Sequence, residues 1–340
     1  MVNMLNKNRN ILVDIKDSKI LFLTGGKSIV SSMSEVITHK DNILKIQFSS
    51  APDNILLKEV SLLIKKNPHI NLRFYGNYSE DQIKWEFLSE IEGLNIDLWE
   101  TKNLNEIKNL KNLKRLGITK NVKSSVSLKI IENLKELEIL FTSISKDIEA
   151  IGDLKKINLL SLSEIKTNDL SFLSNNINLS KLFISLGSIK DISGISKLKN
   201  LNTLSIHQLK QFDENAANSL ISNNSSIENL ELMNLVNLSN FEFISNFKNL
   251  ITLNLEGLKK IKSYSDLGKN NNLKVLSGFD CRPIDKSLKG LENINSIKLG
   301  DSYSKSEIET FLPNFKGENL WIRGKQIRGI NIFGGRFSII

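Results

Sequence analysis

The chain has 340 residues, a formal net charge of +9 and one cysteine, Cys281. A single cysteine excludes an intramolecular disulfide framework, which indicates a reducing, cytoplasmic setting. No stretch is long and apolar enough to span a membrane, and Asp14 interrupts the apolar run near the start before it reaches the length of a secretory signal. Secretion by a route without a cleaved signal is an alternative that the sequence leaves open.

Residues 1–40 are predicted to form an N-terminal cap. Two short apolar runs, 11–16 and 19–23, are separated by Asp17 and Ser18 and indicate a hairpin. Such a hairpin would cover the open end of a repeat array, whose first unit otherwise exposes an apolar face.

The run Thr24-Gly25-Gly26-Lys27-Ser28 follows this hairpin and invites comparison with a phosphate-binding loop. That motif needs a glycine five residues before its Gly-Lys pair, where this chain has Leu21. We therefore expect a turn in the cap at this point.

Residues 41–324 are predicted to form a repeat array of about thirteen turns. Two apolar positions, spaced two residues apart, recur at intervals of 21 to 23 residues, except for two intervals of 26. The first position holds Ile46, Leu72, Leu94, Leu116, Leu137, Leu160, Leu182, Leu204, Leu230, Leu253, Leu276, Ile297 and Leu320. The second holds Phe48, Phe74, Ile96, Ile118, Ile139, Leu162, Ile184, Ile206, Leu232, Leu255, Gly278, Leu299 and Ile322. This spacing predicts one short strand with a single buried side in each repeat.

The period and the Leu-x-x-Leu-x-Leu core resemble the leucine-rich repeat superfamily, and the unit at 189–206 is most similar to the short internalin-like repeats of bacteria. The resemblance implies an α/β solenoid with a curved parallel sheet on its concave side and short helices and turns on its convex side. The chain departs from the family three residues after the second strand position. The family usually has Asn there, and this chain has Trp99, Ile165, Leu209 and Cys281 among other residues.

Helix signals lie in the two long intervals. Asp53 is a predicted N-cap ahead of an amphipathic segment at 54–66, and 214–221 is a weaker version. Ser79 to Gln82 has the spacing of a capping box. Residues 325–340 are predicted as a C-terminal cap, with a hairpin at 330–340 around a Gly-Gly pair.

No catalytic residue, metal site or cofactor is predicted. Cys281 occupies the Asn position of its repeat, which favours a buried structural thiol over a nucleophile. His69 and His207 lie six repeats apart, roughly 29 Å at the usual strand spacing, so they cannot share a metal or a proton relay. The remaining histidine is His39.

The positive charge is not expected on the concave side. The strand positions that face it hold seven basic residues: Lys45, Arg73, Arg115, Lys120, Lys181, Lys298 and Arg323. They also hold eight acidic residues: Asp97, Glu136, Glu138, Glu164, Glu231, Glu256, Asp280 and Asp301. A basic groove for nucleic acid is therefore not expected on that face, and the excess lysines lie on the convex side.

The predicted function is non-enzymatic protein–protein recognition on the concave face by a monomer, of bacterial immunity or effector type. The predicted binding residues are apolar and acidic: Glu136, Glu138, Leu140, Leu159, Phe183, Leu186, His207, Glu231, Met233 and Glu256. They suit a partner with a basic, partly apolar surface. Two alternatives stay open, a specificity or scaffold subunit of an enzyme complex, and nucleic-acid binding through the convex lysines.

Overall fold

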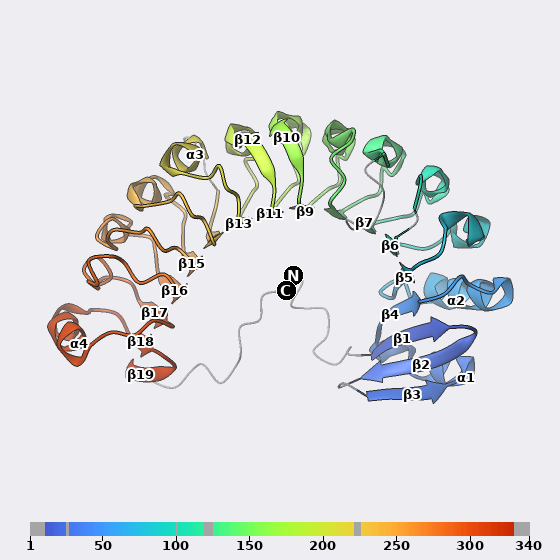
Figure 1. The fold of residues 1–340 in the computed structure, drawn as a ribbon, viewed down its shortest axis with the longest axis horizontal. Helices are drawn as coiled ribbons and strands as arrows, with labels where there is room; N and C mark the ends of the chain where they lie inside the picture. Colours follow the sequence, from blue (N-terminus) through green and yellow to red (C-terminus); the bar gives the residue numbers. More distant parts are fainter. Residues whose placement is uncertain (1–10, 25–26, 100, 119–124, 221–225, 330–340) are drawn as a thin grey trace. The chain divides into compact units, whose positions relative to one another are not determined.

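The computed structural model describes residues 11–24, 27–99, 101–118, 125–220 and 226–329. It separates into two compact units, residues 1–165 (unit 1) and residues 166–340 (unit 2). In each unit the parallel strands lie along the inner side and short helices lie along the outer side (Figure 1). No helix among these residues is long and apolar enough to cross a membrane.

Unit 1 begins with three short strands and a helix and continues as a parallel sheet. The initial elements are β1 (Ile11–Lys16), β2 (Lys19–Thr24), β3 (Lys27–Ser31) and α1 (Met33–Thr38). The parallel strands are β4 (Ile43–Phe48), β5 (Asn71–Gly76), β6 (Gly93–Leu98), β7 (Arg115–Ile118), β8 (Ile139–Thr142) and β9 (Leu159–Ser163). The outer side carries α2 (Asn54–Lys66) and the 3₁₀ helices η2 (Lys40–Asn42), η3 (Glu80–Gln82), η4 (Trp85–Leu88), η5 (Asn105–Asn109), η6 (Leu128–Asn133) and η7 (Ile148–Asp153).

Unit 2 repeats this plan. Its main sheet contains β11 (Lys181–Ser185), β13 (Thr203–His207), β14 (Asn229–Met233), β15 (Thr252–Glu256), β16 (Val275–Phe279), β17 (Ser296–Leu299), β18 (Asn319–Ile322) and β19 (Lys325–Arg328). A separate pair is formed by β10 (Lys166–Asp169) and β12 (Ser188–Asp191). The helices are α3 (Glu214–Ser219), α4 (Lys305–Phe311), η8 (Ser171–Asn175), η9 (Ser193–Lys197), η10 (Glu242–Asn246), η11 (Leu267–Lys269) and η12 (Leu312–Asn314).

The predicted N-terminal hairpin is present, and the predicted C-terminal one lies outside the described residues. β1 and β2 pair in antiparallel fashion around Asp17 and Ser18. Both turn residues have positive φ, 49° and 60°, as a tight two-residue hairpin turn requires. Near the other end, β18 pairs in antiparallel fashion with β19, and the predicted hairpin at 330–340 would follow it.

The core of each unit is a stack of strand residues from successive repeats. Leu204 of β13 is fully buried, and its register partners are Leu182 of β11 and Leu230 of β14. A single repeat is too thin to bury such a leucine, so each repeat shields the apolar residues of the next. Twelve of the thirteen predicted strand pairs occupy these positions, and the predicted solenoid with a parallel inner sheet is confirmed.

The exception is β8, where the predicted register is wrong by three residues. Leu140, rather than Leu137, is the register partner of Leu116 on β7 and of Leu160 on β9. Ile131, Leu134, Leu137 and Leu140 are spaced by three and are all fully buried, so the apolar pattern has no unique phase in this repeat. Leu140 therefore lies in the core and not on the exposed strand face.

The helix signals are confirmed. Asp53 caps α2 by accepting hydrogen bonds from the N–H groups of Ile55 and Leu56, at 2.9 and 3.1 Å. Ser79 and Gln82 form the predicted capping box, at the start of η3. The weaker signal at 214–221 corresponds to the shorter helix α3.

Four strands of unit 2, β11, β13, β14 and β15, are each followed directly by a turn residue with a left-handed backbone. These residues are Leu186, Gln208, Asn234 and Gly257. The N–H of each donates to the carbonyl of the last residue of the following strand, at 2.7 to 3.0 Å: Leu186 to His207, Gln208 to Met233, Asn234 to Glu256 and Gly257 to Phe279. The turn that closes one repeat is thus completed by the next repeat.

Buried or partly buried carboxylates join neighbouring turns on the outer side. Glu80 accepts from the N–H groups of Lys102 and Asn103 at 2.9 and 3.0 Å. In unit 2, Glu214 accepts from the N–H and hydroxyl of Ser239 at 2.6 and 2.7 Å. Partial burial acts to raise the pKa of Glu214, but the hydrogen bonds from Ser239 outweigh it and leave the pKa below its ordinary value.

This shift predicts a pH dependence of stability. A carboxylate whose pKa is lower in the folded state stabilises the fold above its unfolded pKa, and the contribution disappears as pH falls through the folded pKa. We expect Glu214→Gln to reduce the free energy of unfolding at pH 7 by about 1 kcal/mol or less, because partial exposure screens the charge. Urea unfolding at a series of pH values measures the difference, which should shrink below about pH 4.5. A difference that is constant from pH 7 to pH 3 would contradict the charged hydrogen bonds.

The corrected register of β8 also has a direct test. Leu140→Ala should reduce the free energy of unfolding by about 2–5 kcal/mol, because it leaves a cavity between two repeats. Phe141→Ala, one residue further along, should cost far less, because the Phe141 side chain is 48% exposed. Urea unfolding of both variants compares the two positions, and a larger loss for Phe141→Ala would restore the original register.

Candidate functional site

Alternate residues of each inner strand point away from the core and form what we call the strand face. Burial alternates along β11, β14 and β15, with the outward residues partly exposed. Because the strands are parallel and in register, outward residues of neighbouring strands lie side by side. A ligand on the inner side of either unit would meet these residues first.

Unit 2 brings most of its predicted binding residues together on the strand face. His207 of β13, Met233 of β14 and Glu256 of β15 are successive register partners. Two residues earlier on the strands, Phe183 of β11 aligns with Ser205, which aligns with Glu231. Leu186 lies just beyond β11, in a left-handed turn, and is 44% exposed.

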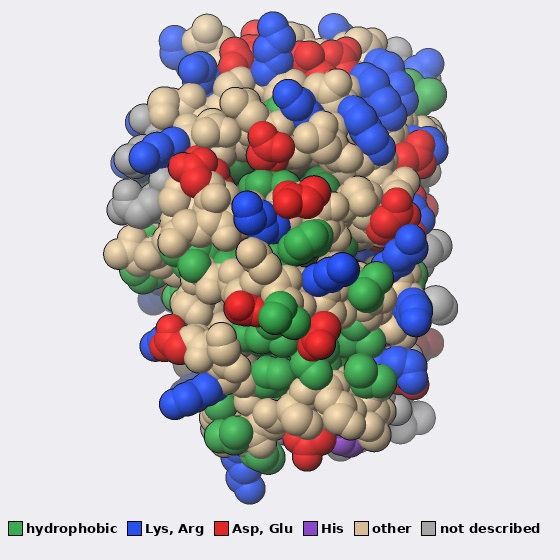
Figure 2. All heavy atoms as spheres, turned by 90° about the vertical axis from the view of Figure 1, so that its right-hand side faces the viewer, with side chains coloured by type: hydrophobic (Ala, Val, Ile, Leu, Met, Phe, Trp, Pro, Cys, Tyr) green, Lys and Arg blue, Asp and Glu red, His purple; other side chains and the backbone are tan. Residues whose placement is uncertain are grey.

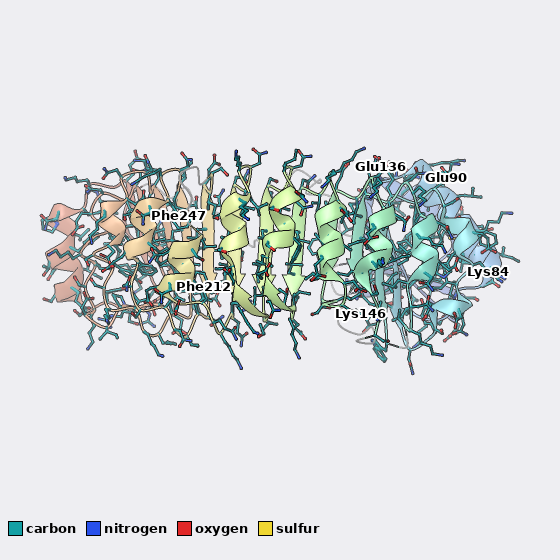
Figure 3. All side chains as sticks on the ribbon, turned by 90° about the horizontal axis from the view of Figure 1, so that it is seen from above. Lys84, Glu90, Glu136, Lys146, Phe212 and Phe247 are labelled. Carbon is teal, nitrogen blue, oxygen red and sulfur yellow. The ribbon has the colours of Figure 1, made fainter. Side chains whose placement is uncertain are left out.

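The predicted residues of unit 1 are placed differently. Leu140 is fully buried in the core, whereas Leu159 alternates with the core residue Leu160 and keeps the predicted outward position, although it is only 5% exposed. Glu136 and Glu138 precede β8, because the strand begins three residues later than predicted. The Glu136 side chain is on a lateral edge of the unit (Figure 3), where it pairs with Lys156 at 2.6 Å. Leu140, Glu136 and Glu138 are therefore removed from the strand face.

Polar contacts on the strand face of unit 2 are local. The Ser205 hydroxyl donates to Glu231 at 2.7 Å, and the Asn234 side-chain amide lies 3.2 Å from Nε2 of His207. A neutral His207 ring can accept this hydrogen bond. Among the described residues, neither Glu231 nor Glu256 has an ion-pair partner, so both carboxylates present uncompensated charge.

One exposed aromatic residue of this surface was missed in the sequence. Phe279 ends β16, is 61% exposed and is the register partner of Glu256. Its ring lies over Gly300, where a Cβ would approach the ring to 2.3 Å. The sequence did carry a signal for it. Phe279 directly follows Gly278, the only glycine at the second strand position of the repeats, and so occupies an outward position of its strand. We refer to Phe183, His207, Glu231, Met233, Glu256 and Phe279 as the unit 2 patch.

Cys281 is buried, as expected. It is 1% exposed, and its sulfur lies 3.3 Å from the hydroxyl oxygen of Tyr264. Burial raises the pKa of the Cys281 thiol to about 12, so very little thiolate is present at neutral pH. No group of three His, Cys, Asp or Glu side chains in the described part of the chain is arranged to hold a metal ion.

The burial of Cys281 predicts that its thiol reacts slowly with added reagents. We expect a thiol reagent at pH 7.5 to label the native protein at least 100-fold more slowly than the urea-unfolded protein, because the thiol is both buried and protonated. A time course with a chromogenic disulfide measures both rates. Equal rates would show that Cys281 is accessible and reactive.

Comparisons with known proteins agree with this architecture. No family model and no curated protein matches the chain. An internalin (inlF) from Listeria monocytogenes matches with a TM-score of 0.50 and 17% identity, over 84% of this chain and 87% of that one. Internalin C2 from the same organism matches at 26% identity and a TM-score of 0.39, over 51% of this chain and 74% of that one. A third match is the TLR13–ssRNA13 complex, at 16% identity and a TM-score of 0.46, over 77% of this chain and about half (51%) of that one. The repeats of this chain thus form a leucine-rich-repeat solenoid similar in fold to an internalin.

Proposed function

We propose that this chain is a non-enzymatic recognition protein and that the unit 2 patch binds a protein partner. The observation that carries the proposal is the exposure of large apolar side chains on a strand face. Phe279 at the end of β16 is 61% exposed, Leu186 after β11 is 44% exposed, and Phe183 and Met233 are partly exposed. Covering such side chains releases water and stabilises a complex, and aromatic residues commonly dominate the binding energy.

The charge of the patch supports a basic partner. Glu231 lies two residues before Met233 on β14, Glu256 is the register partner of Met233 on β15, and neither carboxylate has an ion-pair partner within the described residues. An apolar surface with two such carboxylates next to it complements a lysine- or arginine-rich helix, or a cationic toxin, that also presents an apolar side chain.

The one cysteine is buried, with a raised pKa, which supports a protein without a cysteine nucleophile. A second observation weighs against the nucleic-acid alternative. The face of unit 1 in Figure 2 shows lysine and arginine interspersed with aspartate and glutamate. A phosphate backbone requires a continuous basic surface, so a mixed surface favours a protein partner over nucleic acid.

The proposal is tested by capturing the partner from source cells and measuring its affinity for purified variants. Phe183→Ala, Phe279→Ala and Glu231→Lys should each weaken binding at least 10-fold, which is about 1.4 kcal/mol, without lowering the free energy of unfolding by as much. Matched controls in unit 2 are Ile284→Ala and Glu242→Lys, which change exposed residues outside the patch.

The controls should retain the affinity of the unsubstituted protein. If they weaken binding and the patch variants do not, the proposed surface is wrong. If the captured partner is an enzyme that remains associated through purification, the chain acts as its specificity or scaffold subunit. A steep loss of affinity with salt for an oligonucleotide would instead support the nucleic-acid alternative.

A further inference from the structure

Unit 1 presents a different surface at the ends of β5 and β6. Trp99 directly follows β6 and is 47% exposed, although the repeat pattern calls for a polar residue there. Its ring contacts Tyr75 of β5 edge to face, with ring centroids 6.1 Å apart. The guanidinium of Arg73 lies 4.6 Å from the centroid of the Tyr75 ring. We call Arg73, Tyr75 and Trp99 the aromatic ledge.

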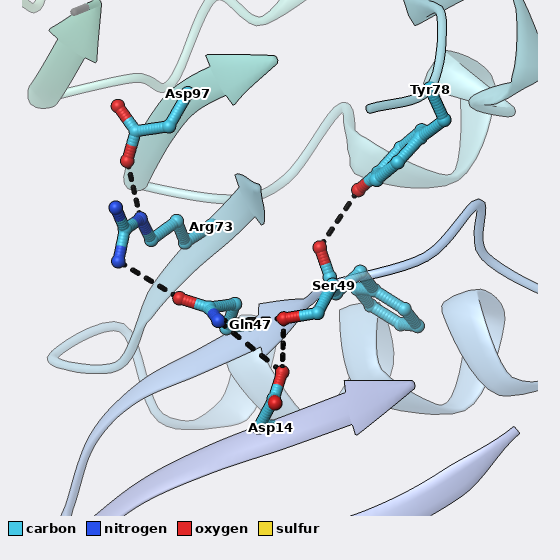
Figure 4. A network of polar contacts seen from close by, with 7 residues as sticks. Asp14, Gln47, Ser49, Arg73, Tyr78 and Asp97 are labelled. Carbon is cyan, nitrogen blue, oxygen red and sulfur yellow. Dashed lines mark hydrogen bonds and ion pairs between the residues drawn. The ribbon is translucent and has the colours of Figure 1, made fainter. Parts of the chain in front are cut away.

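Of the described carboxylates near the ledge, Asp97 and Asp14 each accept hydrogen bonds from neighbouring side chains. Figure 4 shows Arg73 between Asp97, which accepts from its Nε, and Gln47, which accepts from its Nη1 at 2.9 Å. Asp14 accepts from Ser49 and from Gln47, at 2.5 and 3.3 Å. Asp97 is only 4% exposed, so an incoming cation cannot reach it. Among the described residues, the Nη2 group of Arg73 has no acceptor and is left for a ligand.

A second cation, Lys45, lies on the same strand face as Arg73. Lys45 of β4 is the register partner of Asn71, two residues before Arg73 on the same strand face. It has no ion-pair partner in the described chain. Burial and, to a smaller extent, the charge of Arg73 lower the pKa of Lys45, and together they outweigh the opposing effect of the Asp97 carboxylate.

Exposed aromatic surface therefore lies next to two cations, Arg73 and Lys45, that share one buried carboxylate, Asp97. We propose that the aromatic ledge and Lys45 form a second binding site, which takes an acidic segment of a protein partner with an apolar or aromatic side chain next to a carboxylate. The apolar side chain packs on Trp99 and Tyr75. The carboxylate accepts hydrogen bonds from Nη2 of Arg73 and Nζ of Lys45, which are charge-assisted. The site goes beyond the proposed function, because the unit 2 patch is acidic and selects the opposite charge.

The test uses the full chain and two short synthetic peptides. The acidic probe alternates glutamate with phenylalanine and leucine, and the control probe has lysine in place of each glutamate. Calorimetric titration should show the acidic probe binding at least 10-fold more tightly than the lysine probe, with an affinity that falls as salt is added. The unit 2 patch does not take part, so Glu231→Lys should leave this affinity within about twofold.

Substitutions are chosen to leave the fold intact. Trp99→Ser and Lys45→Gln should each weaken the acidic probe about 5- to 10-fold, and Lys45→Arg should restore most of the affinity. Ile55→Ser and Lys111→Gln are matched controls, because Ile55 is exposed on the outer helix α2 and Lys111 is exposed outside the inner strands of unit 1. Arg73 is left unchanged, since its removal would leave Asp97 buried without its ion-pair partner and destabilise the unit.

Three results would overturn the proposal. One is equal or tighter binding of the lysine probe, which would mean that the site selects cations. Another is unchanged affinity in Trp99→Ser, which would place the peptide elsewhere. The third is no binding of the acidic probe at millimolar concentration. If a single-stranded oligonucleotide then binds instead, and binds more weakly to Trp99→Ser, the site takes nucleic acid and the proposal is equally wrong. The proposed function is separate from these results. It stands if the captured partner still binds the unit 2 patch.

Discussion

The packing of strand leucines between successive repeats is the constraint on which the rest of the structure depends. Leu182, Leu204 and Leu230 are each almost completely buried, and each is covered only because a neighbouring repeat supplies the next residue of the stack. This packing keeps the strands parallel and in register, and register decides which side chains reach the strand face. The composition of both candidate binding surfaces therefore follows from the alignment of buried leucines behind them.

The sequence predicts the fold well, because each strand is marked by two buried apolar residues and this pair recurs at a nearly constant interval along the chain. It fails at β8, where Ile131, Leu134, Leu137 and Leu140 offer several equally apolar phases. The choice between them depends on how the longer segment before β8 packs, and this is a tertiary property. One slip of three residues moved Leu140 from the core to the predicted binding surface and placed Glu136 and Glu138 on a strand that begins after them.

The candidate surfaces were harder to predict than the fold. Phe183, Glu231, Met233 and Glu256 were found because their repeats have an unambiguous phase, whereas Phe279 follows a glycine that weakens the pattern. Trp99 was visible as a departure from the expected Asn, but its contact with Tyr75 depends on the pairing of β5 with β6. Side-chain contacts between two strands can be predicted only when the register of the strands is known. The periodic pattern alone carries no information about the orientation of aromatic rings.

The left-handed turns of unit 2 make each repeat depend on the repeat that follows it. Each turn residue donates its N–H to the strand that comes next in the chain, as Gln208 does to Met233 and Asn234 to Glu256. In the folded protein each of these turns is therefore held by the strand after it. Fraying of one strand leaves the N–H of the preceding turn to water, so a local opening also loosens the repeat before it.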